Sequence, residues 1–321
     1  MKERHTGAFR VLLYLVIPTV LVVIAVAVGL SACGGSEGPS ANATPSTASP
    51  SGSPISVVGR TTAQGARLPS DAVVAALEGR IAAMNQRDGE AAAAIYAEDG
   101  VLEETDLSPH GFARGRKGLA TRFNELYDLG LRLAPAGAPI ANGRYVAEPT
   151  RFYHGTMPGR GAGMLVFEID AQNKFAYQWE IGWAGGPEKT FGLVKSPSVD
   201  RPNLPPREIE KILDAHMAAV NGGDGRTAAA LYAQRGVLEE TSRHPGLETK
   251  GQENIAVRLG ELHDAGLRLA SAGASIAYDK YVAEPVRFLD GDGNETGAGM
   301  LVFEFDPAYR IAHQWVIGRV D

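Results

Sequence analysis

Apolar residues recur at helical spacing in two stretches of the chain. The first stretch has Val73, Leu77, Ile81 and Met84, with Arg80 on the same face. The second has Ile209, Leu213, Met217 and Val220, with His216 on the same face. Residues three and four apart share one face of a helix, so each stretch predicts a helix with one buried side that also carries Arg80 or His216. Further helices are expected at residues 91–97 and 117–129, and again at residues 227–233 and 254–265.

Segments typical of strands lie between and after these helices. In the first half of the chain they begin with the strand VLEET at Val101 and continue at residues 144–153, 163–170 and 175–183. The second half has VLEET again at Val237 and extended segments at residues 280–289, 299–306 and 311–319. Glu148 and Glu284 precede prolines in extended segments, and their structural interpretation is that they only end strand pairing. Helices and strands that are segregated in this way predict an α+β domain with a mostly antiparallel sheet.

The two halves are copies of each other. VLEET recurs after 136 positions (237 − 101), and the same displacement carries GAGMLVFE at Gly161 onto Gly297. Residues 68–182 align with residues 204–318 without insertion or deletion, and about half of the positions are identical. Repeats of small structural units recur at about 20 to 50 residues, so this longer period indicates two complete domains. We refer to them as the first and the second copy.

The N-terminus has the layout of an export signal. Lys2, Arg4 and Arg10 precede an apolar run at residues 11–30, which leads into Leu-Ser-Ala-Cys. These four residues resemble the lipobox of bacterial lipoproteins, in which the chain is cut before the cysteine and that cysteine, here Cys33, is acylated. The alternative is an uncleaved membrane span, for which about 20 apolar residues suffice. Both place the rest of the chain outside the cytoplasm, and the first anchors it by lipid to the extracytoplasmic side of the cell membrane.

The segment after Cys33 predicts a flexible tether. It is dominated by Gly, Ser, Pro, Ala and Thr, a composition with too few large apolar groups to offset the entropy of ordering. The predicted organisation is a signal peptide at residues 1–33, the tether at 34–67, a first domain at 68–184, a linker at 185–203 and a second domain at 204–321.

Composition narrows the chemistry. The net charge is −6 and no basic cluster occurs beyond the signal, which argues against nucleic acid as a partner. Cys33 is the only cysteine, so neither an intrachain disulfide nor a multi-cysteine metal site is expected. No sequence motif of a metal, nucleotide or acyl-serine enzyme occurs, and we therefore expect no cofactor.

The element order, with Asn-x-x-Asp-Gly, Leu-Tyr-Ala and Gly-Val-Leu-Glu-Glu in sequence, resembles the NTF2-like superfamily and its SnoaL-like and ketosteroid-isomerase-like branches. The resemblance spans nearly all of each copy. It implies two tandem cone-shaped domains, in each of which a curved, mostly antiparallel sheet wraps around helices and forms an apolar pocket. The superfamily hosts isomerases, dehydratases, cyclases and proteins without chemistry, so the fold alone assigns no activity.

The resemblance also implies pocket residues, because successive side chains of a strand alternate between its two faces. It places Glu104 and Glu240 where the isomerase branch has its general-base carboxylate. The pocket residues that it implies are Arg80, Glu104, Leu165, Phe167, Tyr177 and Trp179 in the first copy, and His216, Glu240, Leu301, Phe303, His313 and Trp315 in the second.

Steroid isomerase chemistry lacks support. The isomerase branch stabilises its oxyanion with a tyrosine and a protonated aspartate. At the tyrosine position this chain has Arg80 or His216, and at the aspartate position it has Leu165 or Leu301. Without neutral donors at a developing oxyanion, the largest electrostatic contribution to that reaction is missing.

The two copies suggest different chemistry. Arg80 near Glu104 would form an internal ion pair or a site for an acidic ligand. His216 and His313 near Glu240 would form a set able to pass a proton, and these three are the candidate catalytic residues. Each also has a structural interpretation, since a glutamate on a short strand is commonly solvated and a histidine on an apolar face commonly packs in the core.

Three functions remain open. The first is a surface-tethered protein whose pockets bind small apolar or amphipathic molecules. The second is an isomerase, lyase or cyclase that uses a pocket carboxylate as general base, and the third is a non-catalytic interaction protein of the cell envelope. Isolated NTF2-like domains commonly pair through the outer faces of their sheets. Because Met164, Val166, Met300 and Val302 would leave apolar patches there, we expect the copies to pack sheet to sheet as an intramolecular pseudo-dimer.

Overall fold

The structure is a computed structural model. It describes residues 68–105, 111–155, 160–183, 192–194, 197–241 and 246–318. The predicted signal peptide, the tether and Cys33 lie outside the described residues. Over the described ranges, no helix combines the length and the apolar character that crossing a membrane requires.

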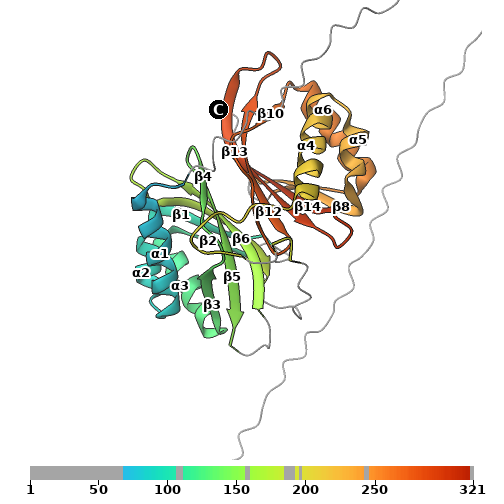
Figure 1. Ribbon diagram of the computed structural model, residues 1–321. Coiled ribbons are helices and arrows are strands. Elements are labelled where there is room, and N and C mark those ends of the chain that lie inside the picture. The colour runs from blue at the N-terminus through green and yellow to red at the C-terminus, as the bar shows by residue number, and fades with distance from the viewer. Residues whose placement is uncertain are drawn as a thin grey trace, which may run out of the picture. The chain divides into compact units, whose positions relative to one another are not determined.

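Three helices belong to the first copy: α1 (Asp71–Asn85), α2 (Gly89–Ala94) and α3 (Gly115–Asp128). Helix α1 follows Ser70, whose hydroxyl accepts a hydrogen bond from the backbone N–H of Val73 (3.4 Å) and so caps the helix. The predicted face of α1 is buried, Arg80 included. The three helices lie together on one face of the first sheet (Figure 1). We refer to this face as the inner face and to the opposite one as the outer face.

Seven strands form the first sheet: β1 (Tyr96–Glu104), β2 (Gly111–Arg114), β3 (Leu131–Pro135), β4 (Ile140–Asn142), β5 (Tyr145–His154), β6 (Arg160–Ile169) and β7 (Phe175–Trp183). Their order across the sheet is β2-β1-β7-β6-β5-β3, and β4 also pairs with β5. Strands β1 and β7 pair in parallel, whereas the other described pairs of this sheet are antiparallel.

The second copy repeats this arrangement. Its helices are α4 (Arg207–Asn221), α5 (Gly225–Ala230) and α6 (Gln252–Asp264). Its strands are β8 (Tyr232–Glu240), β9 (Leu247–Lys250), β10 (Arg268–Ser271), β11 (Ile276–Tyr278), β12 (Tyr281–Leu289), β13 (Glu295–Phe305) and β14 (Ile311–Gly318). The strand order is β10-β12-β13-β14-β8-β9, with β11 on β12. The predicted fold class is confirmed: α+β, with two tandem domains, each a curved and mostly antiparallel sheet against helices.

Each sheet has three more strands than the sequence predicted. In the first copy these are β2, β3 and β4, which are only three to five residues long and offer too few positions for an alternating pattern. The expectation that Glu148 ends strand pairing was wrong, since β5 continues to His154. Pro149 is tolerated because it lies between the residues that pair with β4 and those that pair with β3, where no ladder partner needs its missing N–H.

The Asn-x-x-Asp-Gly motif holds helices in place. Asn85, at the end of α1, exchanges two hydrogen bonds with the backbone of Leu133 on β3 (2.8 and 3.1 Å). Asp88 caps α2 by accepting from the backbone N–H of Ala91 (2.8 Å). The second copy repeats these bonds at the equivalent positions. The motif therefore explains the architecture rather than a chemical activity.

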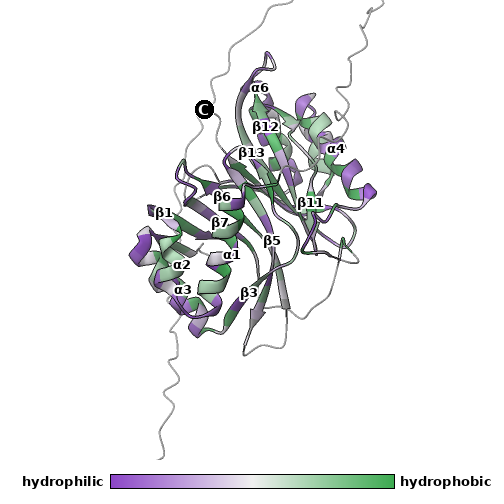
Figure 2. Cartoon of the chain, turned by 60° about the vertical axis from the view of Figure 1, so that its left-hand side comes forward, coloured by the Kyte–Doolittle hydropathy of each residue, from purple (hydrophilic) through white to green (hydrophobic). Residues whose placement is uncertain are grey.

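Each copy has a hydrophobic core between its helices and the inner face of its sheet. In the first copy Leu77 and Phe123 from the helices meet Leu165 and Phe167 from β6. Leu213, Leu301 and Phe303 are among the equivalent residues of the second core. Figure 2 shows hydrophilic residues on the outward sides of α2 and α3. Burial of one helix side against the sheet is thus what the helical spacing predicts.

A third cluster of buried residues draws on the outer faces of both sheets. It includes Met164, Val166, Trp179 and Ile181 from the first copy and Met300, Val302, Trp315 and Ile317 from the second. Successive side chains of a strand point to opposite faces of the sheet. The strand residues next to those of the inner core therefore point into this third cluster.

Hydrogen bonds join the two copies beside this cluster. The Asn142 side chain on β4 donates to the backbone carbonyls of Val286 (2.8 Å) and Gly299 (2.9 Å) in the second copy. Arg151 Nε on β5 donates to the Tyr278 hydroxyl on β11 (2.9 Å). Asn142 and Tyr278 occupy equivalent positions of the two copies (278 − 142 = 136), so both copies use the same strand for this contact.

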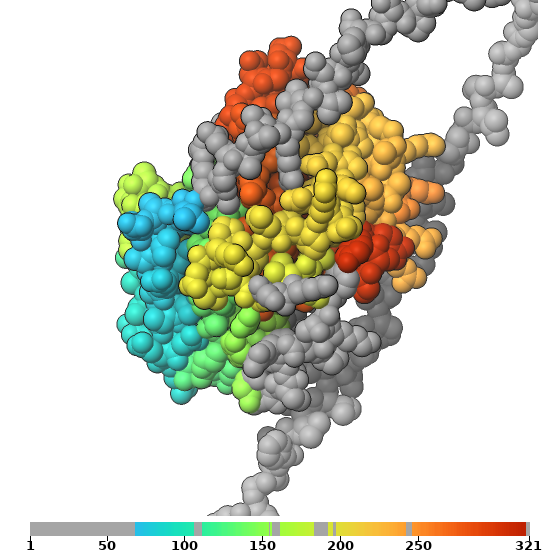
Figure 3. Space-filling view, viewed as in Figure 1, coloured from blue at the N-terminus to red at the C-terminus, as the bar shows by residue number. Residues whose placement is uncertain are grey.

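The described end of the linker is bonded to both copies. The Asn203 side chain is buried, donates to the carbonyl of Ala136 (2.9 Å) and accepts from the backbone N–H of Ser198 (2.7 Å). Its backbone carbonyl accepts from the N–H of Ala277 on β11 (2.7 Å). Figure 3 shows the yellow atoms of this stretch at the surface.

Candidate functional site

A row of carboxylates crosses the inner face of the first sheet. Glu148 on β5 is the register partner of Leu165 on β6, Leu165 is the partner of Glu180 on β7, and Glu180 is the partner of Glu104 on β1. Residues opposite each other in neighbouring strands share a face of the sheet, so all four point toward the helices. All three carboxylates are buried. Helices α1 and α3 carry the arginines that contact these carboxylates, Arg80 and Arg122.

Arg80 reaches the Glu148 end of this row from α1. The Arg80 side chain is fully buried, and its Nη2 lies 3.8 Å from Glu148 Oε2. Nη1 donates to Met84 Sδ (3.3 Å), and the guanidinium carbon lies 5.1 Å from the centroid of the Phe167 ring. Arg80 Nε, Arg80 Nη2 and Glu148 Oε2 are buried and have no hydrogen-bond partner among the described residues. Three polar atoms of this pair are therefore unsatisfied inside an apolar core.

The environment of Glu148 favours its neutral form. Burial raises the pKa of the Glu148 carboxyl to about 7, against which the positive charge of Arg80 acts, while Glu78 adds to the rise. A carboxyl with this pKa exchanges its proton close to neutral pH. Both protonation states of the Glu148 carboxyl are therefore populated near neutral pH.

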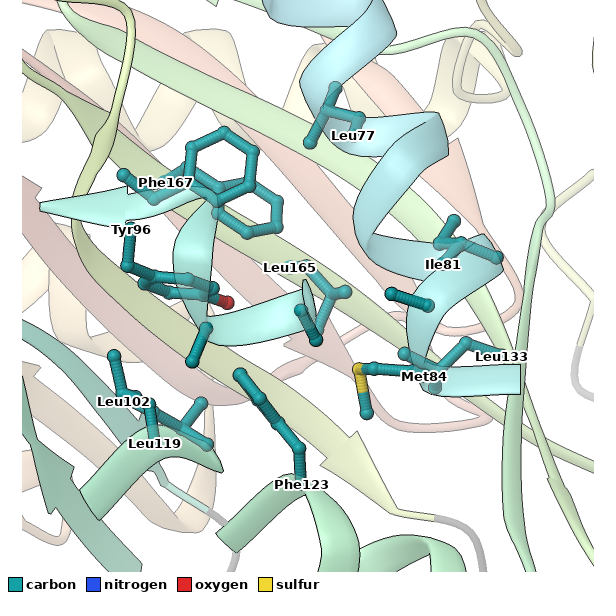
Figure 4. Close-up of a cluster of buried hydrophobic side chains, with 14 of the residues drawn as sticks. Leu77, Ile81, Met84, Tyr96, Leu102, Leu119, Phe123, Leu133, Leu165 and Phe167 are labelled. Carbon is teal, nitrogen blue, oxygen red and sulfur yellow. The ribbon is translucent and has the colours of Figure 1, made fainter. Parts of the chain in front are cut away.

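A hydrogen-bonded chain lies next to this pair. The Tyr96 hydroxyl on β1 donates to Gln178 Oε1 on β7, and Gln178 Nε2 donates to Glu180 Oε2 (3.4 Å). Burial raises the pKa of Tyr96 above its ordinary range, and the nearby Arg80 opposes that rise. Figure 4 shows Tyr96 beside Leu165 and Phe167. We refer to Arg80, Glu148, Tyr96, Gln178 and Glu180 as the Arg80–Glu148 site.

The second copy satisfies the same region with its own side chains. His216 replaces Arg80; its Nε2 lies 3.2 Å from the Tyr232 hydroxyl, which donates to Gln314. Burial lowers the pKa of His216 to about 4, so its imidazole is neutral near pH 7. Val316 replaces Glu180, and this removes one carboxylate from the row. Of the two copies, only the first holds a buried guanidinium beside a buried carboxylate among the described residues.

Glu104 and Glu240 face inward as predicted, but each is held by an arginine from a helix. Arg122 on α3 donates to both Glu104 oxygens (2.7 and 2.8 Å), and Arg258 on α6 contacts both Glu240 oxygens in the same way. The hydrogen bonds to Glu104 raise the pKa of Arg122 above its ordinary range. A two-pronged arginine pair positions a strand on a helix and leaves the carboxylate poorly suited to accept a substrate proton.

The predicted inward orientation of the last strand was wrong. Tyr177, Trp179, His313 and Trp315 belong to the outer face: Trp179 and Trp315 lie in the third cluster, and Tyr177 packs against it. The reason is register. Trp179 is the partner of Val166, and an antiparallel pair on one face must be outward together.

On the outer face, both copies build the same stack. Tyr177 stacks on Trp179 (ring centroids 4.2 Å apart) and donates its hydroxyl to Glu103 Oε2 (2.6 Å). His313 stacks on Trp315 at 3.8 Å, and its Nε2 lies 3.0 Å from Glu239 Oε2. Burial and the bond to Glu103 raise the pKa of Tyr177 above its ordinary range.

The candidate catalytic residues of the second copy do not form one set. Glu240 binds Arg258, His216 contacts Tyr232, and His313 pairs with Glu239 on the opposite face. In the first copy the expected neighbours Arg80 and Glu104 have separate partners as well. The inward orientation expected of four apolar residues agrees with their place in the inner cores, and their contact with a ligand stays a prediction: Leu165, Phe167, Leu301 and Phe303.

Sequence reasoning missed Glu148, Glu180, Tyr96 and Gln178. The sequence shows which residues of one strand share a face. It does not show which residues of two neighbouring strands lie opposite each other. The signal that would have found Glu148 is its spacing of two residues from Val146. Val146 belongs to the inner core, and residues two apart in a strand lie on the same face. Among the described residues, no group of three or more His, Cys, Asp or Glu side chains is arranged to hold a metal ion.

Several solved structures match about a third of this chain each. A SnoaL-like family protein from Agrobacterium tumefaciens is 19% identical, with a TM-score of 0.31, over 35% of this chain and 97% of its own. A protein with a ketosteroid isomerase-like fold from Catenulispora acidiphila, in complex with trimethylamine, is 11% identical, with a TM-score of 0.29, over 33% of this chain and 82% of its own. An NTF2-like protein of unknown function from Cytophaga hutchinsonii is 10% identical, with a TM-score of 0.29, over 35% of this chain and 89% of its own. No protein-family model matches the sequence, and no curated protein does.

Proposed function

We propose that the first copy binds a small, mainly apolar molecule through one polar group at the Arg80–Glu148 site. The observation that carries this proposal is the set of three buried, unsatisfied polar atoms on Arg80 and Glu148. Buried polar groups are nearly always hydrogen-bonded, and leaving one unsatisfied costs about 1–3 kcal/mol. A ligand group that bonds to all three atoms would recover that cost, while Phe167 and Met84 offer apolar contact beside it.

In this proposal the second copy supports the first. His216 is neutral and within hydrogen-bond distance of Tyr232, so the equivalent region needs no further partner. This assignment differs from the expectation that the candidate catalytic residues His216, Glu240 and His313 lie in the second copy. A duplication with one binding domain and one supporting domain explains why the scaffold is repeated but position 80 and its equivalent differ.

We also propose that the protein is an exported lipoprotein, anchored through Cys33 on the extracytoplasmic side of the membrane. The support is the sequence Leu-Ser-Ala-Cys after an apolar run, followed by the predicted tether. Metabolic labelling with a palmitate analogue tests this proposal. Label should appear on the wild-type chain and be lost in Cys33→Ala, and label retained in that variant would contradict it.

The sheet-to-sheet pseudo-dimer is part of the same proposal. The shared outer-face cluster and the hydrogen bonds of Asn142 and Arg151 to the second copy support it. Contacts between equivalent surfaces are the geometry of a twofold dimer. In this arrangement both outer faces are used for assembly, and ligand binding is left to the inner faces.

Purification of the full-length chain from its natural source, followed by native mass spectrometry, tests the binding function. We expect a small molecule to be retained by the wild type and lost in Arg80→Met. The matched control is Arg87→Met, since Arg87 lies just beyond α1 with an exposed side chain paired to Asp128. Equal retention in both variants would contradict the proposed site.

One observation favours a second candidate function, proton transfer by Glu148. Its pKa of about 7 makes both protonation states available near neutral pH. The molecule released from the protein, incubated with it in D2O, would then gain deuterium with the wild type and not with Glu148→Gln. Binding without any exchange would exclude this chemistry and leave the binding function intact.

A further inference from the structure

The donors and the acceptor of the Arg80–Glu148 site define the polar group that it takes. We propose that this group is neutral and carries a carbonyl oxygen next to an N–H, as in a primary amide or a lactam. This inference rests on the proposed binding function and adds the chemical class of the ligand. The unsatisfied atoms on each side of the site carry it.

Arg80 supplies the donor side. Nη1 is used by Met84, whereas Nε and Nη2 have no partner among the described residues. These two nitrogens lie on one edge of the planar guanidinium and direct their N–H bonds in parallel. An oxygen acceptor facing that edge receives both bonds. Since the guanidinium stays charged even when buried, this acceptor is the strongest requirement of the site.

Glu148 supplies the acceptor side. Its Oε2 lies 3.8 Å from Arg80 Nη2 and accepts from no described residue. At pH 8, above its raised pKa of about 7, the Glu148 carboxyl is largely ionised. An ionised carboxylate has no donor of its own, so the ligand must bring an N–H or O–H. Because both unsatisfied sides belong to one closely spaced pair, the ligand's acceptor and donor must be neighbours.

Charge excludes two simpler head groups, a carboxylate and an amine. A carboxylate satisfies Arg80 but has no donor for Glu148 and brings a second anion beside it. An amine satisfies Glu148 but has no acceptor for Arg80 and brings a second cation. Burying an additional charge is costly, whereas an amide provides both functions without charge. The second copy lacks this pair, so we expect one ligand per chain.

The test uses three probes with one tail: octanamide, octanoate and octylamine. Isothermal titration of the full-length chain at pH 8, where Glu148 is largely ionised, should give one site and an affinity for octanamide about tenfold or more above the other two. In Glu148→Gln the new side-chain amide donates instead, so the preference should move to octanoate. Arg80→Met should weaken octanamide and octanoate alike.

The control is Glu125→Gln, which removes an exposed carboxylate on α3 and should leave all three affinities unchanged. Thermal melting shows that each variant is folded. A wild type that prefers octanoate or octylamine overturns the amide class but leaves the binding function standing. The class also fails if no probe binds while the naturally purified chain holds a molecule without an amide. If no probe binds and the natural chain holds no molecule, both the class and the binding function fail.

Discussion

Arg80 and Glu148 lie side by side in the core of the first copy without forming a hydrogen bond, with Arg80 Nη2 3.8 Å from Glu148 Oε2. Removing each charge from water costs several kcal/mol, which an ion pair repays only with good geometry and further hydrogen bonds. This pair lies beyond hydrogen-bond distance, and Arg80 Nε, Arg80 Nη2 and Glu148 Oε2 have no hydrogen-bond partner among the described residues. Departures of this kind from consistent packing concentrate at functional sites, and this is why we assign the site here.

Loss of one member of the pair should cost more than loss of both. Arg80→Met removes the charge that holds down the pKa of Glu148, so at pH 8 the buried carboxyl must take up a proton or stay an uncompensated anion. Protonation one unit above a pKa of about 7 costs about 1.4 kcal/mol, so the free energy of unfolding should fall by about 1–2 kcal/mol. The double variant Arg80→Met/Glu148→Gln should recover most of that loss. Urea titrations of the four proteins measure the coupling. At pH 5 the single variant should be much less affected, and an equal loss at both pH values would show that the loss comes from packing instead.

Glu148 should make the protein less stable as the pH rises. Its pKa is raised in the folded chain, from an ordinary value of 4.5 to about 7, so the neutral form is favoured by folding. The stabilisation is fully present below about pH 4.5 and is lost as the pH rises through 7, by roughly 3 kcal/mol in all. Burial is the main cause of this raised pKa; the charge of Arg80 opposes it and the charge of Glu78 adds to it. Glu148→Gln should flatten this part of the stability profile, and an unchanged slope would contradict the raised pKa.

His216 should act in the opposite direction. Burial lowers its pKa from 6.5 to about 4, so the unfolded chain takes up a proton more readily than the folded chain. The stabilisation is present above pH 6.5 and is lost as the pH falls through 4. His216→Gln should remove this acid-side loss of stability in urea titrations. If the variant and the wild type lost stability in parallel from pH 7 to pH 4, His216 would not be buried in its neutral form.

The register of the last strand explains how far sequence reasoning reached. The helical spacing of Val73 and Leu77 predicted the buried face of α1, because the period of a helix is contained in one element. For β6, alternation and the resemblance together placed Leu165 correctly on the inner face. Placing Trp179 required the pairing of β7 with β6. A register shift between the pairs of Glu168 and Ile169 lies in that hairpin, and no pattern within either strand reveals it.

The candidate site was missed for a related reason. Glu148 precedes a proline, which lacks the backbone N–H that a paired strand residue donates. A proline is tolerated inside a strand only where the neighbouring strand needs no hydrogen bond from that position. That position, between the pairings of β3 and β4, depends on two strands too short to predict. Arg80 was predicted on the buried face of α1, but its partner could only be identified once β5 was placed beside that helix.

The arginine pairs at Glu104 and Glu240 should matter for stability and not for ligand binding. Glu104→Gln weakens a two-pronged, charge-assisted contact between α3 and β1, so a loss of about 1–2 kcal/mol in the free energy of unfolding is expected. Glu240→Gln should behave alike in the second copy. Octanamide affinity should be unchanged in both variants. A loss of binding with intact stability in Glu104→Gln would instead restore the pocket role inferred from the resemblance.

Asn142 should hold the two copies together. Asn142→Ala removes the donor for the buried carbonyls of Val286 and Gly299, so those groups lose their partner. Hydrogen exchange should accelerate in β4, β12 and β13, and the inner-face cores should stay protected. The matched control is Asn254→Ala, which removes an exposed bond to the carbonyl of Lys250 on the second copy. Exchange that is unchanged in Asn142→Ala would argue against the pseudo-dimer.

The most direct test is a crystal structure of the full-length chain purified from its natural source, with the density between Arg80 and Glu148 as the measured quantity. We expect a bound organic molecule that accepts from Arg80 Nε and Nη2 and donates to Glu148 Oε2. A direct ion pair between Arg80 and Glu148 at hydrogen-bond distance, enclosed by Phe167 and Met84 with nothing bound, would contradict it.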